Sequence, residues 1–67
     1  MTPDDFRAIR AKTLGLTPYE LAPLMGVHVR TIQRWENGER SVPGIAVALL
    51  EYLQRDHELV SNRNHKN

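Results

Sequence analysis

The stretch LAPLMGVHVRTIQRWENG, residues 21–38, decides the fold that this sequence predicts. It indicates a short helix that ends at Gly26, a tight turn, and a second helix that ends at Gly38. Glycine is favoured just past a helix C-terminus, because the backbone there often adopts a positive φ. So short a turn predicts a steep crossing angle, which makes the second helix protrude.

The second helix of this pair is amphipathic. At about 100° of rotation per residue, the apolar side chains fall on one face and the polar ones on the other. The apolar face holds Val27, Thr31, Ile32 and Trp35, and the opposite face holds Val29, Arg30, Gln33, Arg34 and Asn37. In an isolated helix, such a polar face is usually only a solvated surface. Its interpretation therefore depends on the rest of the chain.

The helix before the turn has a clear start. Thr17 and Glu20 have the spacing of a capping box, with Pro18 at the first helical position. Three apolar residues are expected to form its core-facing stripe: Leu21, Leu24 and Met25. Pro23 lies inside this helix and removes a backbone donor. The helix is therefore predicted to be short or kinked.

The N-terminal segment repeats the same capping pattern. Thr2 is followed by Pro3 and, at the third helical position, by Asp5, so a first helix should begin at Pro3. The residues expected to face the core are Phe6, Ile9, Ala8 and Leu14. Gly15 is expected to end this helix or to follow its end.

A further helix is predicted to begin at Pro43 and to close the core. Its core stripe is expected to contain Ile45, Ala46, Ala48, Leu49, Tyr52 and Leu53. Val47 and Leu50 should point away from that stripe and, with Leu59 and Val60, form an exposed apolar patch. They form either a dimer contact or scattered apolar surface. We assign residues 1–60 to one domain and residues 61–67 to a flexible polar tail.

Two stretches together resemble a known family. LTPYELAPLMGV at residues 16–27 and TIQRWENG at residues 31–38 are similar to the Cro/C1-type (XRE-like) helix-turn-helix of phage and bacterial repressors. The resemblance covers about residues 5–55. It implies an all-α, compact bundle of four to five helices with a lambda-repressor-like fold. It also implies that the third helix enters the major groove of DNA.

The family's base-reading positions correspond here to Val29, Arg30, Gln33 and Arg34. Arg30 or Arg34 can grip guanine with two hydrogen bonds, and each can instead bind phosphate. Gln33 can pair with adenine or contact a phosphate, whereas Val29 offers only apolar contact with a thymine methyl group.

Six residues are expected to face the DNA backbone: Thr17, Tyr19, His28, Thr31, Asn37 and Arg40. Two departures from the family affect this set. Pro18 replaces a common phosphate-binding Gln, which leaves Tyr19 or a nearby backbone N–H to serve. His28 replaces the usual Ser or Thr cap and is a poor cap. It either donates to a phosphate or is a partly exposed structural residue.

The resemblance also bears on the scaffold. Arg10 corresponds to a family arginine that pairs with the glutamate before Asn-Gly, here Glu36. We expect this pair to be structural. The segment between Arg10 and Leu16 is one residue longer than usual in the family, which leaves its register open.

Composition limits the function. The chain has 67 residues, a net charge of +1 and no cysteine, so a zinc finger is not indicated. The charge is low for a DNA-binding protein, although Arg30, Arg34 and Arg40 lie on the proposed DNA side. No catalytic or metal-binding motif and no membrane-spanning stretch is apparent. We therefore expect a cytoplasmic non-enzyme without cofactor or small-molecule ligand.

These inferences predict a transcriptional regulator, most simply a repressor that binds an inverted-repeat operator on double-stranded DNA as a homodimer. The family is compatible with autoregulation of a phage, plasmid or anti-CRISPR operon. The alternative is an antitoxin or protein-interaction module in which DNA binding is secondary.

Overall fold

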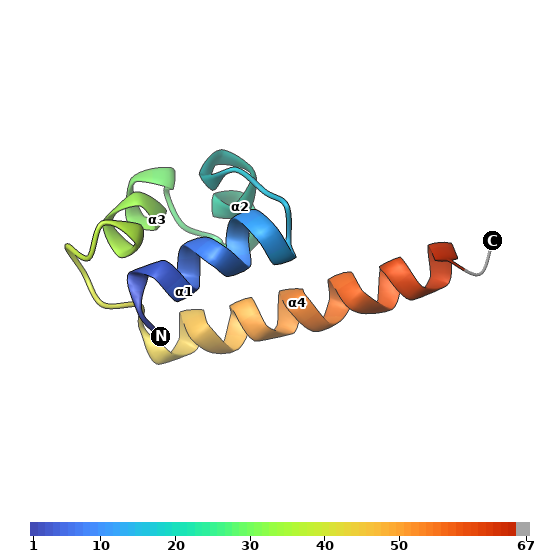
Figure 1. The fold of residues 1–67 in the computed structure, drawn as a ribbon. Coiled ribbons are helices and arrows are strands. Elements are labelled where there is room, and N and C mark those ends of the chain that lie inside the picture. The colour runs from blue at the N-terminus through green and yellow to red at the C-terminus, as the bar shows by residue number, and fades with distance from the viewer. Residues whose placement is uncertain (66–67) are drawn as a thin grey trace.

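The computed structural model describes the backbone of residues 1–65 and the side-chain burial of residues 1–57. Within these residues the chain is all-helical (Figure 1). The elements are α1 (Pro3–Ala8), the π-helical turn η1 (Ile9–Thr13), α2 (Pro18–Met25), α3 (Val29–Glu36) and α4 (Gly44–His65). The predicted all-α helical bundle is confirmed.

Both predicted capping boxes are present. The Thr2 hydroxyl accepts from the Asp5 N–H at 3.0 Å, and the Asp5 carboxylate accepts from the Thr2 N–H at 3.1 Å. The hydrogen bond that the Asp5 carboxylate accepts from the Thr2 backbone, followed by an interaction with the Thr2 side chain, holds the pKa of Asp5 below its usual value of 3.8. Thr17 and Glu20 form the equivalent pair at 3.2 and 2.8 Å. Helices α1 and α2 therefore begin where the sequence predicts.

Helix α2 is short, as Pro23 predicted. It has eight residues and ends at Gly26, which has a φ of +70°. Its stripe differs from the prediction, since Leu24 is 55% exposed and the much smaller Ala22 is buried in its place. Residues 21, 22 and 25 lie on the side of α2 that faces the core, and residue 24 lies outside that side and is exposed to solvent.

The π-helical turn η1 continues α1 through the segment before Leu16, whose register the sequence left open. The Leu14 N–H donates to the Ile9 carbonyl at 2.9 Å, five residues back instead of four. A π turn holds one residue more per hydrogen-bonded ring than an α turn, so it absorbs an inserted residue locally. Leu14 reaches the core in this way, whereas Ala8, which was predicted to help, is exposed.

Every α-helix contributes to one hydrophobic core. Its buried members are Phe6, Leu14, Leu21, Ala22, Met25, Ile32, Trp35, Ala46 and Leu50. The rings of Phe6 and Trp35 meet edge to face, with centroids 5.5 Å apart and planes at 67°. This contact joins α1 to α3 and is of the kind that adds stability beyond the buried area.

The predicted core stripe of α4 is only partly correct, since Ala46, Leu49 and Leu53 pack on the core as expected. Ala46 and Leu50 face the core, with Leu49 and Leu53 partly buried beside them. Three residues expected in the core are exposed instead: Ile45 at 83%, Tyr52 at 60%, and Ala48. Residues 45–50 are an unbroken apolar run, so periodicity alone did not fix which side faces inward.

This correction removes one predicted dimer contact. Leu50 is fully buried against its own chain, so it is not available to a partner. Val47 is half-buried. The side chains of Leu59 and Val60 lie outside the described residues. Residues 61–65, assigned to a polar tail from the sequence, continue the backbone of α4.

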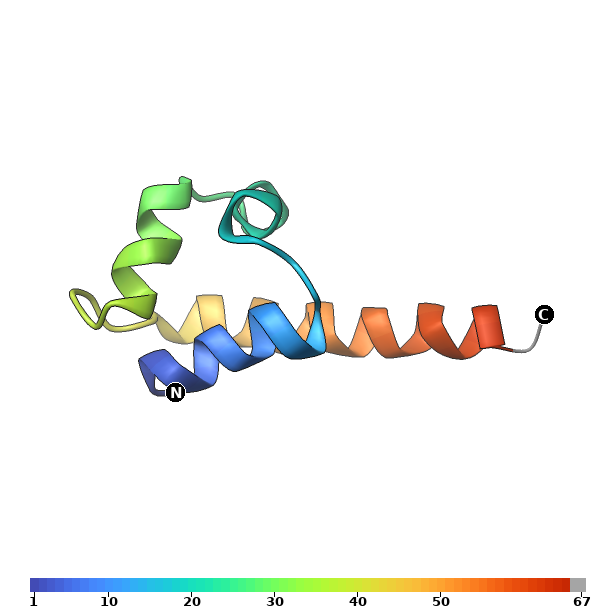
Figure 2. The same ribbon diagram turned by 45° about the horizontal axis from the view of Figure 1, so that its top comes forward.

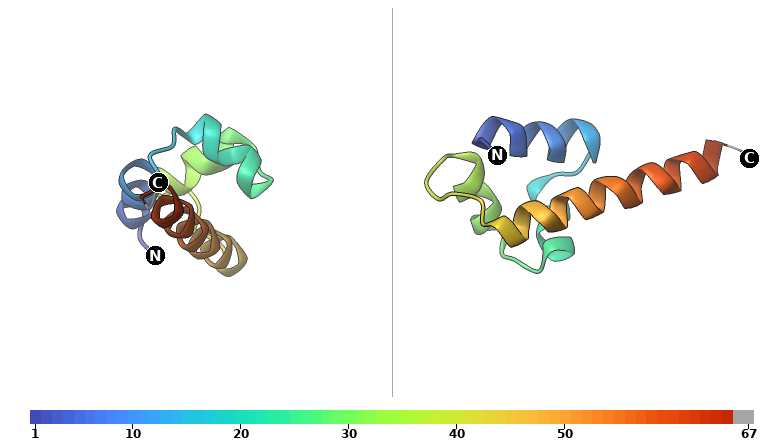
Figure 3. Two further views of the ribbon diagram at one scale, coloured as in Figure 1. Left: turned by 90° about the vertical axis from the view of Figure 1, so that its right-hand side faces the viewer. Right: turned by 90° about the horizontal axis from the view of Figure 1, so that it is seen from below.

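The arrangement of the helices leaves α3 accessible. In Figure 2, α3 stands steeply across the line of α4, and α2 lies beside it on the same side of the molecule. The two further views in Figure 3 show α4 running past the other helices toward its C-terminal end. One face of α3 therefore rests on the core while the other points outward.

Candidate nucleic-acid interface

The turn between α2 and α3 is fixed by backbone hydrogen bonds. The Val27 N–H donates to the Ala22 carbonyl at 3.0 Å, and the Gly26 N–H donates to the Pro23 carbonyl at 3.3 Å. Val27 packs partly against the core, as predicted. The direction in which α3 leaves the core is thus set by short local contacts.

The start of α3 has no side-chain cap. His28 occupies the N-cap position in an extended conformation, and its exposed imidazole makes no capping hydrogen bond. The His28 carbonyl accepts from the N–H groups of Thr31 at 3.0 Å and Ile32 at 3.4 Å. The expectation that His28 caps poorly is confirmed.

The outer face of α3 brings together four predicted DNA-contacting residues. Arg30, Gln33 and Asn37 are exposed and Arg34 is half-buried, whereas Ile32 and Trp35 on the opposite side are buried. With Glu39, the four residues line a shallow hollow of about 270 Å³, which we call the polar depression. Two guanidinium groups, two amides and one carboxylate are therefore presented together.

Sequence reasoning did not find Glu39. Its carboxylate accepts from the Asn37 side-chain amide at 3.4 Å, and its backbone N–H donates to the Arg34 carbonyl at 2.9 Å. Glu39 follows the end of the helix and the positive-φ Gly38, so helical periodicity does not extend to it. The sequence offered one indication: Glu39 follows Asn37 by two residues, with Gly38 between them, and a glycine turn can bring two such side chains together.

The other predicted DNA-contacting residues lie outside the polar depression. Val29 is half-buried and packs against the core, which leaves less of its surface for a base. Arg40 lines a different hollow of about 400 Å³, beside Pro3, Trp35 and Ser41. This hollow and the polar depression on α3 share no lining residue.

The residues predicted to contact the DNA backbone near the starts of α2 and α3 differ in how accessible they are. Tyr19 is largely exposed in the first turn of α2, and the Thr17 hydroxyl is occupied by its capping bond to the Glu20 N–H. His28 is exposed, and Thr31 is half-buried on the side of α3 that turns toward the core.

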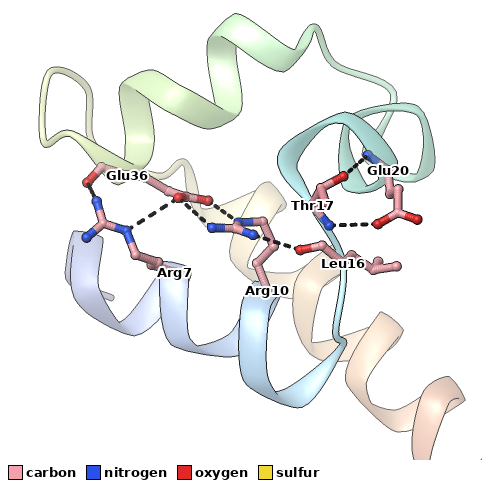
Figure 4. A network of polar contacts seen from close by, with 6 residues as sticks. All are labelled: Arg7, Arg10, Leu16, Thr17, Glu20 and Glu36. Carbon is pink, nitrogen blue, oxygen red and sulfur yellow. Dashed lines mark hydrogen bonds and ion pairs between the residues drawn. The ribbon is translucent and has the colours of Figure 1, made fainter.

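A buried polar network holds the C-terminal end of α3 (Figure 4). The Arg10 guanidinium binds both carboxylate oxygens of Glu36 and donates to the Leu16 carbonyl at 2.7 Å. Only 8% of the Glu36 side chain and 12% of the Arg10 side chain are exposed. The predicted Arg10–Glu36 pair is therefore confirmed, and it joins α3, η1 and the segment leading to α2.

Arg7, whose side chain is 51% exposed, joins this network from its solvent side, and we call the whole the Glu36 network (Arg7, Arg10, Leu16 and Glu36). The Arg7 guanidinium donates to the Glu36 carbonyl at 3.1 Å and lies 3.5 Å from its carboxylate. Sequence reasoning missed it. Its spacing of three residues from Arg10, which places both on one helix face, was the available signal.

The comparison with known families agrees with this geometry. A family model described as helix-turn-helix matches residues 6–60, which is most of the chain. The chain belongs to this family of Cro/C1-type helix-turn-helix proteins. Its general class is that of DNA-binding transcription regulators. Neither the curated proteins nor the solved structures gave a significant match.

The described residues form neither a metal-binding cluster nor a membrane-spanning helix. In the part of the chain that the structure describes, no three His, Cys, Asp or Glu side chains converge as a metal site requires. Among the same residues, no helix combines the length and the apolar character needed to cross a membrane.

Proposed function

We propose that this protein binds an inverted-repeat operator as a homodimer and represses transcription. The observation that carries the proposal is the division of α3 into two faces. Ile32 and Trp35 fix the helix to the core, while Arg30 and Gln33 are exposed on the opposite side. A recognition helix held in this manner can present its side chains to the major groove.

The proposed roles follow from side-chain chemistry. Arg30 reads guanine through paired hydrogen bonds to O6 and N7, and Gln33 pairs with adenine N6 and N7. Arg34 contacts either guanine or phosphate, and Asn37 contacts phosphate. Val29 retains a minor apolar contact with a thymine methyl group. The residues proposed to contact the DNA backbone, besides Asn37, are Thr17, Tyr19, His28, Thr31 and Arg40.

The proposal predicts that two alanine substitutions have different effects. Arg30→Ala should weaken binding to the preferred site about tenfold to a hundredfold, with little loss on unrelated sequences. Asn37→Ala should weaken binding to all sequences by a similar, smaller factor. The operator is first selected from a randomised pool of duplexes, and both variants are then compared by fluorescence anisotropy.

If wild-type protein retains no duplex from the pool, the proposal fails and the interaction-module alternative is favoured. Equal losses for Arg30→Ala on operator and random DNA would show that Arg30 binds only phosphate. Circular dichroism provides the folding control, and both residues are exposed, so neither variant should unfold.

Homodimer formation is proposed to involve the exposed part of α4. Ile45 borders an apolar groove of about 250 Å³ that is also lined by Met25, Val27, Trp35 and Pro43. A two-fold axis beside Ile45 would let each copy place that side chain against the other's groove. The proposal requires that this interface leave the two α3 helices free to occupy half-sites about 34 Å apart.

Ile45→Asp is therefore expected to lower the dimer fraction on operator DNA without unfolding the chain. Sedimentation velocity of protein–operator mixtures measures the stoichiometry, with Glu51→Gln as an exposed α4 control. An unchanged two-to-one complex in the Ile45→Asp variant would show that the dimer contact lies elsewhere.

A further inference from the structure

The polar depression contains an acidic residue in a place where DNA phosphates are expected. Arg30 and Arg34 contribute two positive charges to it, and Glu39 contributes one negative charge. Its formal charge is therefore half of what the arginines alone would supply. The whole chain carries a net charge of only +1. Removing the single negative charge of Glu39 would therefore be a large change in the electrostatic attraction of this surface for DNA.

Among the residues whose side chains are described, the Glu39 carboxylate forms no ion pair. The ion pairs of 4 Å or less within these residues involve Glu36. Its one side-chain hydrogen bond is the exposed, 3.4 Å contact from the Asn37 amide, which is long for a strong bond. The carboxylate therefore remains free to act on a ligand that enters the depression.

The backbone holds Glu39 in this position. Its N–H donates to the Arg34 carbonyl at 2.9 Å, and the Arg40 N–H donates to the same carbonyl at 3.3 Å. These bonds do not involve the Glu39 side chain, so a change from carboxylate to amide should leave the loop intact. The charge of residue 39 can thus be tested separately from the fold.

We propose that Glu39 is a specificity-determining residue that weakens sequence-independent binding to DNA. This inference rests on the proposed function. In a non-specific complex, affinity comes almost entirely from phosphate contacts, and both arginines turn toward phosphates. That brings phosphate oxygens into the depression that holds the Glu39 carboxylate, and like charges repel across a few ångströms.

The repulsion is smaller in the operator complex. There, Arg30 and Gln33 in the first part of α3 turn toward base edges. The phosphate at Asn37 stays near the carboxylate, but the phosphate that Arg30 binds in the non-specific complex is no longer held there. Glu39 therefore destabilises the non-specific complex more than the specific one and raises the ratio of the two affinities. Because the effect is electrostatic and exposed, salt should reduce it.

Glu39→Gln tests this inference, because it removes the charge and keeps the size of the side chain. Affinities for a random-sequence duplex and for the selected operator are measured by anisotropy at about 50 and about 200 mM salt. At the lower salt, the random duplex should bind the variant about fivefold more tightly. The gain on the operator should stay below about twofold, and both gains should shrink at the higher salt.

Glu51→Gln is the matched control, since it makes the same charge change at an exposed position on α4. It should leave both affinities unchanged. Equal gains for the two variants would reduce the effect to overall charge and overturn the inference. Weaker binding by Glu39→Gln would also overturn it, because Glu39 would then support Asn37 and not repel phosphate.

The test separates this inference from the proposed function. If wild-type protein selects an operator but Glu39→Gln changes neither affinity, only the role of Glu39 fails. If wild-type protein binds no duplex, the proposed function fails and the role of Glu39 fails with it.

Discussion

Leu50→Asp is expected to prevent folding. Leu50 is fully buried in the core beside Ala46, so the substitution removes apolar packing and leaves a carboxylate without a partner. Loss of a buried leucine costs about 2–5 kcal/mol, and the unpaired charge adds several more. A chain of this length has about 3–10 kcal/mol of stability in total. The variant should show little helical circular dichroism and no cooperative thermal transition.

Ile45→Asp provides the matched control for Leu50→Asp. It introduces the same carboxylate on the same helix, but Ile45 is 83% exposed. This variant should keep native helicity and a cooperative transition near that of the wild type. A cooperatively folded Leu50→Asp variant would contradict the orientation of α4, and would reopen the prediction that Leu50 lies on a contact surface.

Glu36→Ala should lower the free energy of unfolding by about 3 kcal/mol or more. The substitution leaves the Arg10 guanidinium without its carboxylate in a place where only 12% of its side chain is exposed. Breaking one partner of such a pair costs more than the pair contributes, because the remaining charge is poorly solvated. Urea denaturation followed by circular dichroism measures the change.

Two further variants isolate the cause of that loss. Arg10→Met combined with Glu36→Leu removes both charges, so it should be less destabilising than Glu36→Ala alone. Glu51→Ala, at an exposed position, should change stability by less than about 0.5 kcal/mol. A loss below about 1 kcal/mol for Glu36→Ala would show that the pair behaves as a solvated surface bridge.

The sequence predicted best those features that depend on local hydrogen bonding. The two capping boxes use residues three apart, and their partners are fixed once the helix begins. The helix starts at Pro3 and Pro18 followed from them, whereas the end of α2 followed from the glycine at position 26. The orientation of α4 could not be predicted, because an unbroken apolar run offers more than one possible inner face and tertiary packing chooses between them.

The candidate interface was predictable to the extent that α3 is regular. Its apolar and polar residues separate cleanly, so the exposure of Arg30 and Gln33 followed from helical periodicity. Val29 sits at the border between the two faces, where burial depends on neighbouring helices. Glu39 lies beyond the helix, so only the backbone path through Gly38 shows that its carboxylate adjoins Asn37.

The two ends of α3 are secured to different degrees. At Glu36, hydrogen bonds from the side chains of Arg7 and Arg10 hold the end of the helix. At His28 no side chain caps the first turn, which is held by backbone hydrogen bonds. Fraying is expected to begin at the His28 end, because uncapped termini open most easily. Under the proposed function, small adjustments of this first turn would let α3 accommodate variant base pairs while the axis of the helix stays fixed relative to the core.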